Sequence, residues 1–208
     1  MKSSPASLLL LAILLQAPSA LAAEPSVWTR LKSCDPAVSL EAATVILNDP
    51  ATLKDPGKMF SPAYYLFIHG REQEAVFWFY AAQLRFRIQA VIKGGDHAQI
   101  LAIMLGTVGP PIMNHAYQDI DRLGRTFDEV LAWDRATPDP ARGKVGFGEV
   151  EAKIDAVYSA LADHRARLEA DREALERSAR AEAPALRARY AQIQKPCLEE
   201  RATAGAGQ

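Results

Sequence analysis

Apolar residues recur along most of the chain at intervals of three and four positions, which is the spacing of one face of an α-helix. Two of these runs begin with the same signal, a capping residue followed by a proline in the first helical turn: Asp35-Pro36 and Ser61-Pro62. Gly70 and the pair Gly94-Gly95 stand where later runs stop. The pattern predicts an all-α fold, a compact helical bundle of about seven helices.

The pattern changes after residues 137–148, a stretch rich in proline and glycine that predicts a loop. Before it, residues 24–136 are aromatic-rich and predict the helical core. After it, residues 149–197 predict a long charged C-terminal helical segment that packs on the core, with a kink or break at Pro184. We expect residues 198–208 to form a disordered tail. The apolar seam of the long segment consists of Val150, Ile154, Val157, Leu161, Leu168 and Leu175.

Three further signals set the expected boundaries of the middle helices. Asp96 is placed to cap an apolar run. The pair Pro110-Pro111 is placed to open a new segment that ends near Arg122. Thr126 and Glu129 have the spacing of a capping box, which predicts one more helix start.

Residues 98–113 contain no charged side chain, which favours a buried central helix. The alternative is an apolar groove with the Gly-Pro-Pro sequence at its mouth. Met104 and Met113 would make such a groove adaptable to a partner, because methionine side chains are flexible and polarizable.

Residues 74–92 combine consecutive aromatics with two arginines inside an apolar run. A membrane-spanning helix would place these charges in or beside hydrocarbon at high cost, and a platform for single-stranded nucleic acid would need a basic surrounding that this chain lacks. A core helix remains, with inward residues Phe77, Tyr80, Ala81, Leu84, Ile88 and Val91. The flanking residues are the candidates for binding a partner protein: Trp78, Phe79, Phe86, Arg85 and Arg87.

Part of this region resembles a known helical hairpin. Tyr65, the turn at Gly70, Ala75, Trp78 and the small pair Ala81-Ala82 are similar to one hairpin of the Sel1-like group, which is related to tetratricopeptide repeats. The resemblance implies a helix-turn-helix unit used for protein binding and covers about one tenth of the chain. The interval before the alanine pair is one residue short, and no second copy recurs at the period of a solenoid. The resemblance therefore carries over the hairpin geometry and no functional residue.

The first residues have the layout of a secretory signal peptide. Lys2 precedes an apolar run at residues 8–15, and Ala20 and Ala22 have the small-residue spacing of a cleavage site. We expect residues 1–23 to be removed and the mature protein to be periplasmic or secreted; an uncleaved anchor is the alternative.

Composition and cysteine content add to this picture. The formal net charge is −1 and 49% of residues are hydrophobic, which supports a sizeable core and gives no general attraction to nucleic acid or to an anionic membrane. In an oxidising compartment the two cysteines, Cys34 and Cys197, are expected to form a disulfide that joins the two ends of the chain. Two unpaired thiols are the alternative.

No recognised catalytic or nucleotide-binding motif occurs, and neither a metal nor another cofactor is predicted. His115 and Asp119, one helical turn apart, are the only candidates for a general base and its orienting carboxylate. A hydrogen-bonded pair without a catalytic role is the simpler interpretation.

These observations favour an exported helical protein that binds another protein, with an immunity-type or inhibitor-type protein as one concrete class. A hydrolase-like enzyme that uses His115 and Asp119 and a structural element of the cell envelope are the alternatives.

Overall fold

The computed structural model describes residues 24–94, 97–139, 142 and 147–205, and this part of the chain is all-α. It forms nine α-helices and one 3-10 helix, more than the seven helices expected from the sequence. Residues 1–23, where we expected a signal peptide, lie outside the described residues. The elements are α1 (Val27–Leu31), α2 (Pro36–Asn48), α3 (Pro50–Leu53), η1 (Pro56–Met59), α4 (Phe60–Ile68), α5 (Glu72–Lys93), α6 (His97–Tyr117), α7 (Ile120–Ala136), α8 (Phe147–Ala170) and α9 (Arg172–Gly205).

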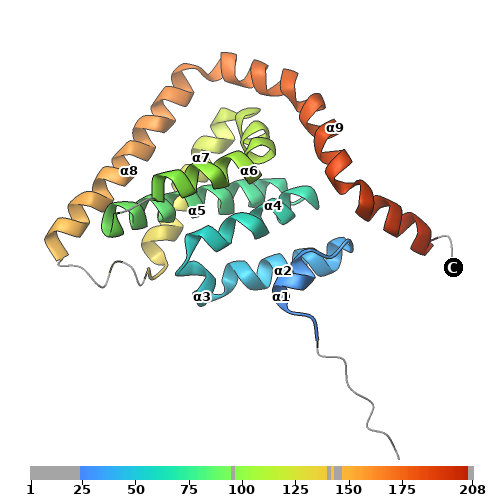
Figure 1. Cartoon of the computed structure of the whole chain (residues 1–208). Helices are drawn as coiled ribbons and strands as arrows, with labels where there is room; N and C mark the ends of the chain where they lie inside the picture. The colour runs from blue at the N-terminus through green and yellow to red at the C-terminus, as the bar shows by residue number, and fades with distance from the viewer. Residues whose placement is uncertain (1–23, 95–96, 140–141, 143–146, 206–208) are drawn as a thin grey trace, which may run out of the picture.

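Helix α5 is the centre of the bundle and contacts α4, α6, α7 and α8 (Figure 1). Because neighbours surround it, side chains on every face are buried, including Phe79 and Ile88. The expected single inward face is therefore only part of the buried surface. Val91, placed on that face from the sequence, is 40% exposed because it lies in the last turn, beyond most of this packing.

Short-range signals set several helix boundaries as expected. The Asp35 carboxylate accepts a hydrogen bond from the backbone N–H of Ala37 at 2.8 Å, and Pro36 occupies the first turn of α2. Gly70 has φ 85° in the turn between α4 and α5, and Gly94 has φ 69° at the end of α5. The helical hairpin implied by the Sel1-like resemblance is thus present as α4 and α5. Helix α4, however, begins at Phe60, directly after η1, so Ser61 is not its cap.

Two further predicted helix starts are wrong. Helix α6 continues through Pro110 and Pro111, because buried contacts of this segment, such as Gly109 against the Phe79 ring, favour the helix over the local break. Asp119, and not Thr126, caps α7: its carboxylate accepts from the backbone N–H of Arg122 at 2.9 Å. Asp96 lies outside the described residues.

Helices α8 and α9 form an arch over the bundle (Figure 1). The helical structure is interrupted at Asp171, the single residue between α8 and α9. Helix α9 continues through Pro184, where we expected a kink or break. Leu168 and Ala183 are buried against the bundle on either side of the apex. The predicted disordered tail is also wrong as far as Gly205, because α9 continues to that residue. Of the loop expected at residues 137–148, the structure describes positions 137–139 and 142, and the helix already begins at Phe147.

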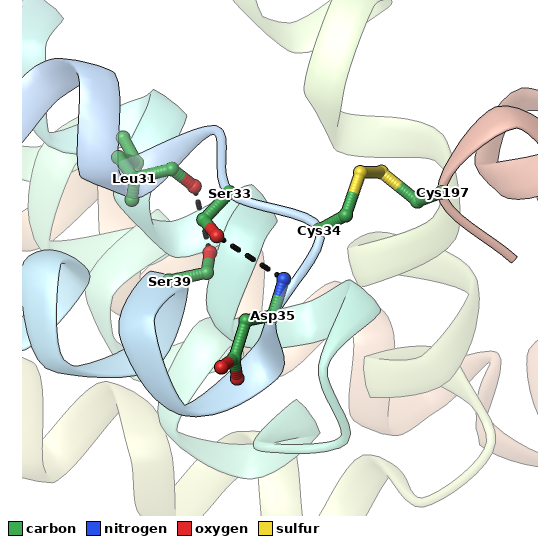
Figure 2. Close-up of a disulfide and its surroundings, with 6 residues drawn as sticks. All are labelled: Leu31, Ser33, Cys34, Asp35, Ser39 and Cys197. Atoms are coloured by element: carbon green, nitrogen blue, oxygen red, sulfur yellow. Dashed lines mark hydrogen bonds between the residues drawn. A yellow bond between two sulfur atoms is a disulfide. The ribbon is translucent and has the colours of Figure 1, made fainter. Parts of the chain in front are cut away.

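A disulfide joins Cys34 to Cys197 across 163 residues, as the sequence predicted (Figure 2). Cys34 lies in the connection between α1 and α2, where the Ser39 hydroxyl donates to the Leu31 carbonyl oxygen at 2.6 Å. Cys197 lies in α9, whose nearby Gln194 side-chain amide donates to the Ile68 carbonyl oxygen at 3.1 Å. The bridge therefore holds the far part of α9 against the N-terminal helices.

Candidate functional site

The structure buries three of the five residues that we expected to bind a partner. Phe79 and Arg85 have no exposed surface and Phe86 is 7% exposed, so the interpretation of an exposed aromatic edge is wrong for them. Trp78 is partly buried and packs edge-to-face against Trp133 with ring centroids 5.5 Å apart. Arg87 is the one member of the set whose side chain is exposed.

Arg85 is buried in the core because it pairs with the buried carboxylate of Asp134. Its Nε–H donates to Oδ1 of Asp134 at 3.0 Å, and its Nη2 donates to the Thr137 carbonyl oxygen at 2.7 Å. The guanidinium also lies over the Trp133 ring, 4.3 Å from the centroid. These contacts explain why an arginine lies among aromatic residues in the sequence. Its side chain links α5 to α7 inside the core.

The second oxygen of Asp134 extends this tie to α8. The Tyr158 hydroxyl donates to Oδ2 at 2.7 Å, and the Arg142 guanidinium contacts the same oxygen. Hydrogen bonding to Asp134 adds to burial in raising the pKa of Tyr158. The cluster supports the packing of α5, α7 and α8.

His115 and Asp119 have separate roles. Asp119 caps α7 and forms an ion pair with Arg122 at 3.1 Å, so its carboxylate is engaged away from an imidazole partner. His115 packs edge-to-face on Phe67, with centroids 5.9 Å apart, and lines a cavity of about 500 Å³ together with Glu72 and others. Burial lowers the pKa of His115, and Arg122 and Arg187 lower it further against the opposing effect of Glu72. The candidate dyad, which was the less favoured interpretation of the sequence, is therefore not formed, and His115 is left as a neutral imidazole facing a cavity.

A second cavity lies between α5 and α8, and we call it the donor pocket. Its volume is about 290 Å³. Part of its lining is polar, and the rest is apolar. Its lining consists of Tyr80, Gln83, Leu84, Arg87, Val157, Ala160, Leu161, His164 and Arg167.

The polar part of the lining carries hydrogen-bond donors and, among the residues that the structure describes, no carboxylate. Gln83 is 5% exposed; its Oε1 accepts from Nη1 of Arg87 at 3.0 Å, while its Nε2 has no partner in the described part of the chain. Burial lowers the pKa of His164, and the charges of Arg167 and Arg87 lower it further. The imidazole is therefore neutral near pH 7 inside a positive field.

An apolar groove adjoins the donor pocket and shares Arg87, Val157 and Ala160 with it. The groove has a volume of about 540 Å³ and lies between the last turns of α5, the first turns of α6 and the middle of α8. Its remaining lining residues are Ala90, Val91, Leu101, Ala102, Leu105, Lys153 and Ala156. Both charged residues that line it, Arg87 and Lys153, are basic.

The groove was partly visible in the sequence as the alternative interpretation of residues 98–113. The structure places it along the first half of that segment, however, and the Gly-Pro-Pro mouth is at the other half, where Gly109 is packed against Phe79. The contribution of α8 could not be inferred, because Ala156, Val157 and Ala160 belong to an ordinary amphipathic pattern.

Within the described residues, none of the helices combines the length and apolar character that a bilayer crossing requires. In the same part of the chain, no three histidine, cysteine, aspartate or glutamate side chains are grouped to hold a metal ion. Comparisons with protein families, curated proteins and solved structures find no match.

Proposed function

We propose that the protein is an exported binding protein that docks an amphipathic helix of another protein in the apolar groove. The observation that carries the proposal is the apolar surface left open where α5 ends and α6 begins. Eight of the ten residues that line the groove are apolar, and one of them, Val91, is 40% exposed. Ile100 and Ile103 of α6 are also exposed but do not line the groove. An apolar surface that none of the described elements covers is typical of an interaction site.

The shape and charge of the groove favour a helical partner with acidic residues beside its apolar stripe. Helix-in-groove binding uses an elongated apolar cleft between packed helices, and here α5, α6 and α8 provide the walls. Arg87 and Lys153 are the charged residues of the lining. Acidic side chains on the partner would complement them and would increase the rate of association.

An immunity-type or inhibitor-type protein, which blocks a toxic enzyme in the same compartment, is the partner relationship that we favour. The predicted signal peptide and the disulfide support a protein that works outside the cytoplasm. Deletion of the gene should then reduce survival in competition with toxin-producing neighbours. Unchanged survival would remove this class while leaving protein binding open.

The test of the groove is a pair of matched substitutions. Val91→Asp places a charge in the groove at an exposed position, whereas Val45→Asp makes the same change on α2, where the valine is 49% exposed. We expect the V91D variant of the mature protein to capture at least tenfold less of its partner from periplasmic extract, and V45D to capture it like the wild type. Equal capture by both variants would overturn the proposal.

His115 supports a second candidate function, a hydrolase-like enzyme. A neutral imidazole that faces a cavity of about 500 Å³ can act as a general base. If so, any hydrolase activity of the purified protein should disappear in His115→Ala and persist in Asp119→Asn, since Asp119 caps a helix. Activity that survives in H115A would dismiss this candidate.

A further inference from the structure

We propose that the donor pocket binds a small carboxylate attached to a short apolar group. This site is separate in kind from the helix-docking groove, and its ligand is measured without any protein partner. The proposal rests on three features of the pocket: two arginines that pair with no carboxylate of the described residues, a buried amide donor without an acceptor among the same residues, and an apolar wall of limited size.

Within the described chain, the two arginines of the pocket lack the carboxylate partner that several other arginines of the fold have. Arg85 pairs with Asp134, and Arg165, on the same helix as Arg167, pairs with Asp128. In the part of the chain that the structure describes, no carboxylate pairs with Arg87 or Arg167. Both nevertheless face the same pocket. Two neighbouring guanidinium groups repel each other, and a bound anion would relieve that repulsion through charge-assisted hydrogen bonds.

Gln83 supplies the second feature. Its Nε2 is buried and donates to no described residue, although its Oε1 accepts from Arg87. A buried donor without an acceptor is destabilising, and native structures retain few of them. A ligand oxygen held by Arg87 would lie beside this amide and could accept its N–H. The amide therefore indicates an oxygen acceptor in the pocket.

The third feature limits the rest of the ligand. Leu84, Val157 and Leu161 form the apolar wall. If each ligand atom takes about the volume of one water molecule in the liquid, a pocket of 290 Å³ holds roughly ten non-hydrogen atoms. A carboxylate with a short alkyl chain fits this size, and the continuity with the apolar groove leaves room for a longer chain.

The carboxylate and its apolar chain could belong to a free acid or to a glutamate side chain of a docked protein. We therefore use two probes, hexanoate as the free acid and the peptide acetyl-Leu-Glu-Leu-amide as the side-chain source. Binding to the oxidised full-length mature protein is followed by NMR chemical-shift titration. Hexanamide, which keeps the shape and removes the charge, and inorganic phosphate, which keeps the charge and removes the chain, are the comparison ligands.

We expect hexanoate to bind and to shift resonances of residues in the donor pocket. Arg87→Gln and Arg167→Gln should each weaken binding about tenfold, the loss expected for one charge-assisted hydrogen bond. Arg177→Gln is the matched control, because Arg177 is an exposed arginine on α9 that pairs with Glu173. Circular dichroism and thermal melting check that the variants keep their fold.

Each outcome decides between the alternatives. Stronger binding of hexanoate than of the peptide identifies a free acid as the ligand, and the reverse identifies a side chain; both support a carboxylate site. Binding of hexanamide or phosphate as tight as hexanoate would overturn the proposal. So would the absence of binding by both carboxylate probes, or hexanoate affinity that R87Q and R167Q leave unchanged.

Discussion

Arg85 on α5 and Asp134 on α7 form an ion pair at 3.0 Å in which neither side chain has exposed surface. The two residues are 49 positions apart in the chain. The pair explains an arginine placed in the most aromatic helix of the protein. It also makes the stability of the core depend on a polar contact.

Replacing Asp134 with alanine should destabilise the protein by about 3–5 kcal/mol, because it leaves a buried guanidinium without its partner. The effect is measured as the free energy of unfolding in urea. Asp128→Ala, which removes an exposed ion pair with Arg165, is the control and should cost less than about 1 kcal/mol. A loss in D134A no larger than in D128A would show that the buried pair contributes little.

Two glycines of α6 should respond oppositely to the same substitution. A Cβ at Gly106 meets no atom within 4 Å, so Gly106→Ala should raise the free energy of unfolding by about 1 kcal/mol through helix propensity. A Cβ at Gly109 would lie 3.1 Å from Cζ of Phe79. That ring has no exposed surface and packs on Phe60 at 5.7 Å, so it has little freedom to move.

We therefore expect Gly109→Ala to be less stable than the wild type, by the roughly 1–3 kcal/mol typical of overpacking. Urea denaturation of the two variants side by side gives the comparison. Equal stabilisation by both substitutions would mean that α6 and Phe79 are loosely packed at this point.

Removing the disulfide should act most strongly on α9. In the chain-entropy account, a loop of 163 residues gives at most about 5 kcal/mol of stabilisation. Beside the bridge, Tyr64 and Tyr190 are in ring contact at 6.3 Å, and Gln194 bonds to Ile68. The double variant Cys34→Ser/Cys197→Ser should therefore lose hydrogen-exchange protection first in the far part of α9, while α5 stays protected. Unchanged protection of α9 would show that the noncovalent contacts suffice.

The protein should become less stable as the pH falls below neutrality. Burial lowers the pKa of His115 and of His164 below the ordinary value of 6.5. Around and below pH 6.5 the unfolded chain then binds more protons than the folded one, so the free energy of unfolding decreases as pH falls. Urea denaturation at about pH 7.5 and about pH 5.5 measures the change, which spans a window above the usual carboxylate pKa values.

The double variant His115→Gln/His164→Gln keeps the polar side chains and removes the titration. Its stability should change less between the same two pH values. If the variant and the wild type lose equal stability, other groups are responsible for the pH dependence.

Three local signals, at Asp35, Gly70 and Gly94, predicted helix ends correctly. Asp35 caps α2, and Gly70 and Gly94 mark helix ends, because the capping geometry and positive φ angles depend on a few neighbouring residues. The disulfide followed from the even cysteine number and the expected compartment. Pro110 predicted a helix start that is absent, because the packing of α6 outweighed its local preference. Thr126 predicted another, but α7 begins earlier, at the cap formed by Asp119.

The faces of the central helix could not be predicted in the same way. A helix surrounded by four others buries residues all round, so the spacing of Phe79, Arg85 and Phe86 carries no information about which of them a neighbour covers. The partner of Arg85 lies on another helix, and the donor pocket combines α5 with α8. Only Arg87, from the original set of partner-binding candidates, lines both the donor pocket and the apolar groove.

The bond between Cys34 and Cys197 turns most of the polypeptide into a closed covalent ring. A protease that cuts the backbone once inside this ring produces two fragments that remain attached through sulfur. The molecule therefore stays in one piece after a first nick, and only a second cut or a reductant releases a fragment. Proteolytic release of material from this ring therefore requires one more cleavage than it would in a chain without the bond.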